Sequence, residues 1–251
     1  MFLKVLYFLV VAAEFVTVPI FLKHYWPQKC KMSFLFKMIS ATLFVLSGYL
    51  AMQIADNHSP YAKLMVWGLV FGWLGDAFLH VLSEKMAYFA VGVVAFLTGH
   101  IFYIIAFQKA IKTTYPDATA FAWYEIAIVV GVCGLIASLA FGLKLIKKEQ
   151  IPLALGLCVY MGVIITMLAK AFRFIIGEIS YGMNDNLVMV AITVGLGAIL
   201  FVLSDGSLGA ILAMDKKARS WRIFNITTYF AAQILLAASI FFVRSFEVLG
   251  A

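Results

Sequence analysis

The sequence predicts an all-α integral membrane protein, with residues 1–251 forming a single bundle of eight transmembrane helices. Hydrophobic residues make up 65% of the chain and charged residues only 12%, whereas soluble domains average about 45–50% apolar and about 25% charged residues. The apolar residues gather in runs of about 20, which is the length that spans a bilayer as a helix. The breaks between these runs are short, so no linker separates a second domain.

The first four predicted helices are delimited by polar breaks. The first run contains Glu14 near its middle and lacks a small-x-small cleavage site, so we interpret it as a helix and not as a signal peptide. The turn formers Asp56-Asn57-His58-Ser59-Pro60 separate the second and third runs, and Ser83-Glu84-Lys85 is a short hairpin before the fourth. The predicted ranges are 3–22, 33–52, 63–82 and 86–107.

The last four helices follow in the same way. Tyr115-Pro116-Asp117 ends the fourth run, lysine-containing breaks follow the fifth and seventh runs, and a short polar break follows the sixth. The predicted ranges are 121–143, 151–176, 187–214 and 221–243. Cys30, Cys133 and Cys158 show no paired spacing, which argues against a disulfide framework or a structural zinc site.

The basic residues are unevenly divided between the two sides of the predicted bundle. The breaks after the first, third, fifth and seventh helices hold Lys23, Lys29, Lys31, Lys85, Lys144, Lys147, Lys148, Lys216, Lys217, Arg219 and Arg222. The other side holds Lys4, Lys63, Lys109, Lys112, Arg173 and Arg244. The positive-inside rule therefore predicts that the first set is cytoplasmic and that both termini lie outside, with a bacterial inner membrane as one expected location. The net charge of +7 reflects this orientation and does not indicate nucleic-acid binding.

One short pattern occurs twice. Leu74–Leu79 and Leu203–Leu208 both fit L-[GS]-D-x-x-L, and each lies in the third helix of a four-helix half. A parallel four-plus-four repeat is one interpretation, and chance similarity in an apolar chain is the other.

Ionisable residues deep in a bilayer are costly, so each is a candidate functional residue. The candidates are Glu14, Lys37, Asp76, His80, His100, Lys170 and Asp205. Asp76 and Asp205 each lie three or four residues past the middle of a predicted helix, and both lie toward the same end of the bundle. Glu14, Lys37, Tyr160 and Tyr229 approach that end as well. We therefore expect these side chains to converge on one polar cavity.

Glycines support this placement. Gly68, Gly72 and Gly75 lie three or four residues apart in the third helix, and Gly195, Gly206 and Gly209 punctuate the seventh. Small residues let membrane helices approach closely, so the third and seventh helices are predicted to be inner helices.

Structural interpretations compete with the functional ones. The two aspartates can be satisfied structurally by a lysine or a helix dipole, and His80 fits a residue at the membrane boundary. His100 with Tyr103 fits a buried hydrogen-bonded pair. Lys170 and Arg173 are expected to extend to the interface while their stems stay in the membrane.

Four segments of this sequence resemble the YhhN-like transmembrane lysoplasmalogenases. They are Gly68–Leu79, Phe96–Tyr103, Gly197–Asp205 and Tyr229–Gln233. Tyr160 with Met167 resembles the family's sixth helix, and Lys37 matches a lysine of the second, although Met38 replaces the proline that usually follows it. The order and spacing agree over nearly the whole chain.

The resemblance implies hydrolysis of the vinyl ether bond of lysoplasmalogens to a fatty aldehyde and glycerophosphoethanolamine or glycerophosphocholine. It further implies catalysis by two intramembrane aspartates without a metal or other cofactor, and these are Asp76 and Asp205 here. Such chemistry needs one protonated and one ionised carboxyl group, a state that two carboxyls in one low-dielectric cavity favour. Lys37 is expected either to hold the headgroup phosphate or to stabilise one ionised aspartate. Glu14, His100, Tyr103, Tyr160, Tyr229 and Gln233 are the expected supporting or substrate-binding residues.

Two other functions remain as alternatives. A proton-coupled transporter would use the same intramembrane acids, although the third and seventh helices carry no proline break. A zinc amidohydrolase of the ceramidase type needs about three histidines and an acid at the metal, and only His80 and His100 are placed within the membrane. The last helix has no lysine in its membrane-spanning part, which disfavours a retinal photoreceptor.

Overall fold

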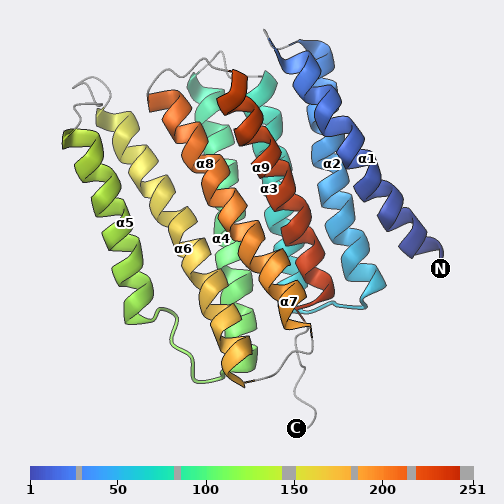
Figure 1. The fold of residues 1–251 in the computed structure, drawn as a ribbon, viewed down its shortest axis with the longest axis vertical. Coiled ribbons are helices and arrows are strands. Elements are labelled where there is room, and N and C mark those ends of the chain that lie inside the picture. Colours follow the sequence, from blue (N-terminus) through green and yellow to red (C-terminus); the bar gives the residue numbers. More distant parts are fainter. Residues whose placement is uncertain (27–29, 82–85, 143–150, 182–185, 214–218, 244–251) are drawn as a thin grey trace.

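The computed structural model describes residues 1–26, 30–81, 86–142, 151–181, 186–213 and 219–243. These residues form helices that run side by side, as Figure 1 shows, and no strand occurs in this part of the chain. The helices are α1 (Phe2–Tyr25), α2 (Lys31–Ile54), α3 (Pro60–Val81), α4 (Met86–Thr114), α5 (Trp123–Gly142), α6 (Ile151–Tyr181), α7 (Leu187–Val190), α8 (Gly197–Ala213) and α9 (Arg219–Ala238). A 3-10 turn, Ser239–Phe241, follows α9.

α7 and α8 are two parts of one long helix. A π-helical segment, Ala191–Leu196, joins them, and Ala191 and Gly197 keep right-handed helical backbone angles at its ends. With these parts joined, the helices match the eight predicted ranges. The main differences are at C-terminal ends, where α4 continues to Thr114 and α6 to Tyr181.

Seven helices within the described ranges are long and apolar enough to cross a membrane. α5 (Trp123–Gly142) is an apolar helix of 20 residues as well. The prediction of an all-helical fold is therefore confirmed, and the long apolar helices are consistent with a multi-pass membrane protein.

Local sequence signals explain where α2 and α3 begin. Cys30 caps α2, since its sulfur accepts the Ser33 backbone N–H and the Ser33 hydroxyl accepts the Cys30 N–H. Ser59 accepts the Ala62 N–H ahead of α3, and Pro60 occupies the first helical position, where no N–H is needed. In the turn between them, the Asn57 amide donates to the backbone carbonyls of Ile240 and Val243, which ties this turn to the end of α9.

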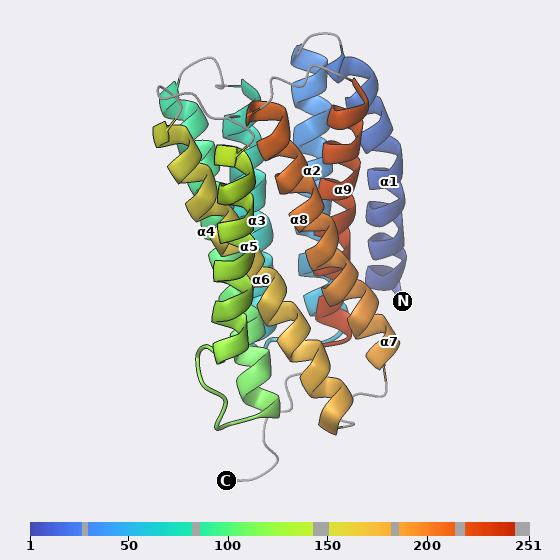
Figure 2. The same cartoon turned by 60° about the vertical axis from the view of Figure 1, so that its left-hand side comes forward.

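α9 is the most buried helix of the bundle. Buried residues make up 56% of its best membrane-spanning window, compared with 44% for the α7–α8 helix and 39% for α3. α9 packs against α1, α2, α3 and α8, while α5 packs on α6 at the edge, as Figures 1 and 2 show. The prediction that the third and seventh helices are the inner ones is therefore incomplete, because the last helix holds the central position.

The predicted four-plus-four repeat is not confirmed. The two copies of the short pattern place their aspartates in different surroundings: Asp76 contacts a lysine and a tyrosine, whereas Asp205 contacts a histidine and a tyrosine. Gly206 and Gly209, which follow Asp205, face open space, whereas a methyl group on Gly75 would meet the ring of Phe96.

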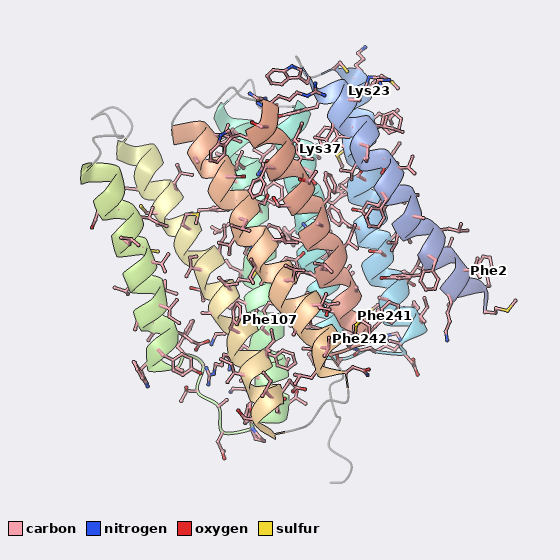
Figure 3. The ribbon with its side chains drawn as sticks, in the orientation of Figure 1. Phe2, Lys23, Lys37, Phe107, Phe241 and Phe242 are labelled. Atoms are coloured by element: carbon pink, nitrogen blue, oxygen red, sulfur yellow. The ribbon has the colours of Figure 1, made fainter. Side chains whose placement is uncertain are left out.

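The bundle has two ends that Figure 3 distinguishes by labelled side chains. Lys23 and Lys37 lie toward the upper end, which we call the Lys37 end. Phe2, Phe241 and Phe242 lie toward the opposite end, which we call the Phe2 end. Both the start of α1 and the end of α9 lie at the Phe2 end, as expected for an even number of helices.

Candidate active site

A cavity of about 390 Å³ lies within the bundle near the Lys37 end. Residues from seven helices line it, and its wall combines charged and polar groups with phenylalanine and leucine side chains. The lining residues that carry the argument below are Lys37, Asp76, Tyr160, Asp205, Arg222, Asn225 and Tyr229. Five of the six residues expected from the sequence to converge thus border one space.

Asp76 of α3 is almost fully buried, with 2% of its surface exposed. Lys37 of α2 places its Nζ 2.8 Å from Asp76 Oδ1 and 3.4 Å from the Asp76 backbone carbonyl. The Tyr229 hydroxyl of α9 donates to Asp76 Oδ2 at 2.8 Å. Every group that contacts this carboxyl is therefore a donor.

A chain of hydrogen bonds behind Tyr229 sets the direction in which its proton points. The Tyr103 hydroxyl of α4 donates to Gln233 Oε1 at 2.8 Å, and the Gln233 amide donates to the Tyr229 oxygen at 3.1 Å. Because the Tyr229 oxygen already accepts a hydrogen bond from the Gln233 amide, the hydroxyl proton of Tyr229 is free to point at Asp76. The predicted supporting residues Tyr103 and Gln233 therefore act at a distance, through Tyr229.

Two glycines of α3 make room for this chain. A methyl group on Gly68 would lie 2.2 Å from the Tyr103 ring, and one on Gly72 would lie 2.5 Å from the Gln233 amide nitrogen. Any larger residue at either position would displace the groups that orient Tyr229. The glycine pattern noted in the sequence thus has a specific role on α3.

Asp205 of α8 has a different set of partners. The Tyr160 hydroxyl of α6 donates to Asp205 Oδ2 at 2.7 Å, and His100 Nε2 of α4 lies 3.1 Å from the same oxygen. The other ring nitrogen of His100 lies 3.3 Å from the Met167 sulfur. His100 also packs edge-on against Phe201, with ring centroids 4.6 Å apart. The alternative of a His100–Tyr103 hydrogen-bonded pair is not what the structure shows, since these two rings only pack edge to face.

Some residues of the site were missed in the sequence. Asn225 donates to the backbone carbonyl and hydroxyl of Ser204, which holds α9 against α8 beside Asp205. Arg222 and Asn225 line the cavity, and Met167 contacts His100 without lining it. The signal for Asn225 was available, because a polar amide within the predicted last helix calls for a partner.

Glu14 does not join the site. Its side chain is fully buried on α1, it does not line the cavity, and neither carboxyl oxygen has a hydrogen-bond partner among the described residues. The expectation that a third acid converges with the two aspartates is therefore wrong. The sequence predicted how deep Glu14 lies along its helix, but it did not predict toward which neighbours the side chain points.

A second cluster of buried charges lies away from the cavity, where α6 meets the segment before α5. Lys170 is 1% exposed and contacts Glu125 Oε2 at 3.0 Å, Gln108 Oε1 at 2.8 Å and the Ala120 carbonyl. Arg173 contacts the same Glu125 oxygen at 2.9 Å. The expectation that Lys170 extends to the interface is wrong, because these acceptors let the ammonium stay buried.

No group of three or more histidine, cysteine, aspartate or glutamate side chains is placed to hold a metal ion in the part of the chain that the structure describes. The side chain of His80 lies outside that part. The polar groups of the site are two aspartates, which contact a lysine, a histidine and two tyrosines.

One known protein family matches the part of the chain that carries these groups. The model of the YhhN family matches residues 32–240, which is most of the chain. The chain belongs to the YhhN family. The matched range includes both aspartates and all of their side-chain partners, but not Glu14. No solved structure matches the chain.

Proposed function

We propose that this protein hydrolyses the vinyl ether bond of lysoplasmalogens, releasing a fatty aldehyde and glycerophosphoethanolamine or glycerophosphocholine. Membership of the YhhN family suggests lysoplasmalogenase-type chemistry. The observation that carries the proposal is that two carboxyl groups line one cavity. A lysine contacts the carboxyl group of Asp76, and a histidine contacts that of Asp205.

Asp76 is the ionised carboxylate of the pair in this proposal. It receives hydrogen bonds from an ammonium and from a hydroxyl whose proton is directed toward it. An ionised carboxylate only accepts hydrogen bonds, so this environment stabilises the charged form.

Asp205 and His100 together hold the proton that the reaction needs. The proposal gives His100 a proton on Nδ1 that points at Met167, because a thioether sulfur only accepts hydrogen bonds. His100 Nε2 then either accepts the proton of a neutral Asp205 or, as imidazolium, donates one to an ionised Asp205. In both arrangements Asp205 and His100 together carry one more proton than they would as an ionised Asp205 beside a neutral His100. This proton is available at the cavity wall, since Asp205 lines the cavity.

The reaction then balances without any other group. The Asp205 proton is added to the β carbon of the vinyl ether, and the double-bond electrons form the new C–H bond and leave an oxocarbenium ion. Water attacks this cation and gives its proton to the Asp76 carboxylate, which forms a hemiacetal. In the last step the hemiacetal hydroxyl returns a proton to Asp205, Asp76 protonates the glycerol oxygen, and the C–O bond breaks. Both aspartates regain their initial states.

The apolar part of the cavity suits the alkenyl chain. Leu79, Phe89 and Phe96 line the wall formed by α3 and α4. The polar groups lie near the Lys37 end, and the uneven distribution of basic residues leads us to infer that this end faces the cytoplasm. A lysolipid would therefore enter with its headgroup toward water and its chain among aromatic side chains.

The test is product analysis by mass spectrometry after incubating the purified protein with an alkenyl lysophospholipid. Asp76→Asn and Asp205→Asn should each lower aldehyde release by about 10²- to 10⁴-fold, the usual contribution of a positioned acid or base. Asp56→Asn is the matched control, because Asp56 is an exposed acid in the α2–α3 turn. Aldehyde release near the wild-type rate in either buried variant contradicts the assignment.

A proton-coupled transporter is the rival function, and one observation favours it. A second cavity of about 670 Å³, lined by Tyr7, Thr193 and Phe241 among others, lies near the Phe2 end. Tyr7, Glu14 and Phe21 are spaced by seven residues on α1, so the unpartnered Glu14 lies between the residues that line the two cavities. Proton-dependent uptake into proteoliposomes without aldehyde release would favour transport over hydrolysis.

A further inference from the structure

Arg222 of α9 is a cation at the cavity wall without an acidic partner. Its guanidinium lies over the rings of Tyr25 and Trp26, 5.8 and 5.9 Å from their centroids. One terminal nitrogen reaches the Tyr25 hydroxyl only at 3.5 Å, and the buried Nε has no hydrogen-bond partner in the described part of the chain. No carboxylate forms an ion pair with Arg222 among the side chains that the structure describes.

The position of Arg222 opposes the local preference of its helix. It lies in the first turn of α9, where the helix dipole disfavours a cation, and no acidic residue shares that turn. The two aromatic rings hold the planar group in place without neutralising it. An arginine kept in a fixed plane with free donors is suited to a phosphate or carboxylate oxygen pair.

Lys37, the residue expected from the sequence to hold a headgroup, is already engaged. Its ammonium contacts the carboxylate and the backbone carbonyl of Asp76. The charge of Lys37 is therefore balanced by Asp76, and Arg222 is the other basic residue among the described residues that line this cavity.

The spacing between Arg222 and the acid–base groups fits a glycerophosphate unit. Arg222 and Tyr229 are seven residues apart on one face of α9, which is two turns or roughly 10 Å along the axis. Tyr229 contacts Asp76, and Asn225 and Ile226 line the cavity between the two levels. A ligand with its vinyl ether beside Asp76 and Asp205 would bring its phosphate toward Arg222, which lines the same cavity.

We propose that Arg222 binds the phosphodiester of a lysophospholipid headgroup and makes the cavity selective for phosphorylated over neutral alkenyl lipids. This inference rests on the proposed function for its catalytic readout. Arg222 recognises the monoanionic phosphodiester of the headgroup and does not contact the amine that follows the phosphate.

The first experiment compares two substrates that differ only in the phosphate. Alkenyl glycerophosphoethanolamine and alkenylglycerol are assayed with the wild type, with Arg222→Gln and with Arg219→Gln. Arg219 is the control, because it is an exposed arginine in the same first turn. Arg222→Gln should raise KM for the phosphorylated substrate roughly 10- to 100-fold, the range expected for losing a hydrogen-bonded charge, and should change kcat little. The alkenylglycerol should be hydrolysed equally by all three proteins.

The second experiment separates phosphate binding from hydrolysis. Saturated 1-alkyl glycerophosphoethanolamine has no vinyl ether, so its binding to the detergent-solubilised protein is measured without reaction, beside 1-alkylglycerol and inorganic phosphate. The proposal expects tight binding of the alkyl phospholipid only, weakened at least 10-fold by Arg222→Gln and unchanged by Arg219→Gln. Equal binding of the alkyl phospholipid to wild type and Arg222→Gln overturns the proposal, even if hydrolysis is found. If no protein releases aldehyde but binding still depends on Arg222, the hydrolase proposal fails and the phosphate site stands.

Discussion

The molecule contains two buried lysine–carboxylate pairs, and their surroundings differ. Lys37 lies 2.8 Å from Asp76, and Lys170 lies 3.0 Å from Glu125. The side chains of the second pair are each 1% exposed, whereas Lys37 is 14% exposed and borders a cavity with Asp76. In the sequence the two lysines look alike, since each lies in an apolar helix. In the structure the Lys37–Asp76 pair lines the cavity, and the Lys170–Glu125 pair does not.

Counting donors explains the difference. The ammonium of Lys170 has three protons and three acceptors, which are Glu125, Gln108 and the Ala120 carbonyl. Glu125 Oε2 in turn accepts from Lys170, Arg173 and the Ala122 N–H. Among the residues that the structure describes, Lys37 has two acceptors, both on Asp76. The Lys170 cluster fastens α5 and the segment before it to α6, whereas the Lys37–Asp76 pair borders a cavity that a substrate can enter.

The largest effect is expected from a substitution that disrupts the Lys170–Glu125 cluster. Lys170→Met leaves Glu125 buried with one cation fewer, and removing one partner of a buried pair costs about 3–5 kcal/mol. We expect a large fall in the thermal unfolding temperature of the detergent-solubilised protein. The rate of aldehyde release per folded molecule should stay within about 2-fold of wild type, because Lys170 does not line the cavity. A stable protein with strongly reduced turnover would show that this cluster contributes to catalysis.

The matched change in the other pair should affect the reaction more than the fold. Lys37→Met removes the cation that stabilises ionised Asp76, so the carboxyl becomes protonated and no longer accepts a proton from water. We expect aldehyde release to fall about 100-fold, within the usual range for losing a general base. Lys63→Met, at an exposed lysine of α3, is the control. Undiminished turnover in Lys37→Met would remove Lys37 from the mechanism.

A smaller effect is expected from one hydrogen bond to Asp205. Tyr160→Phe deletes the donor 2.7 Å from Asp205 Oδ2 and keeps the ring. A single hydrogen bond contributes about 0.5–1.5 kcal/mol, so kcat should change by up to about 10-fold with little change in stability. Tyr124→Phe on α5, where the side chain is exposed, should leave the rate unchanged. An identical response of the two variants would show that Tyr160 does not act on Asp205.

The smallest effect concerns the buried acid that neither region uses. Glu14→Leu removes a carboxyl group without a partner, so the free energy of unfolding should rise by about 1 kcal/mol. Glu178→Leu is the contrast, since the Glu178 carboxylate accepts the Thr114 hydroxyl at 2.9 Å and should lose stability when replaced. Thermal unfolding of both variants measures this. A destabilised Glu14→Leu protein would mean that Glu14 has a partner in the working protein.

The sequence alone determined the helices and the candidate acids. The bilayer sets a span of about 20 apolar residues, so long apolar runs and their polar breaks predicted all eight helices, although α4 and α6 extend past their predicted C-terminal ends. An ionised group in hydrocarbon is costly, so Asp76 and Asp205 stood out without any knowledge of the packing. The depth of these residues followed from counting along each helix.

Only the tertiary structure decided which side chains meet. In a soluble protein the polar face of a helix reveals its orientation, but lipid tails are as apolar as the interior of a membrane bundle, so the pattern of these helices says little about how each one is rotated. For that reason Glu14 was expected in the cavity and lies outside it, and Lys170 was expected at the interface and is buried. The pairing of Lys37 with Asp76 and of His100 and Tyr160 with Asp205 depends on helix rotation and contact, which arise only when α9 packs at the centre of the bundle.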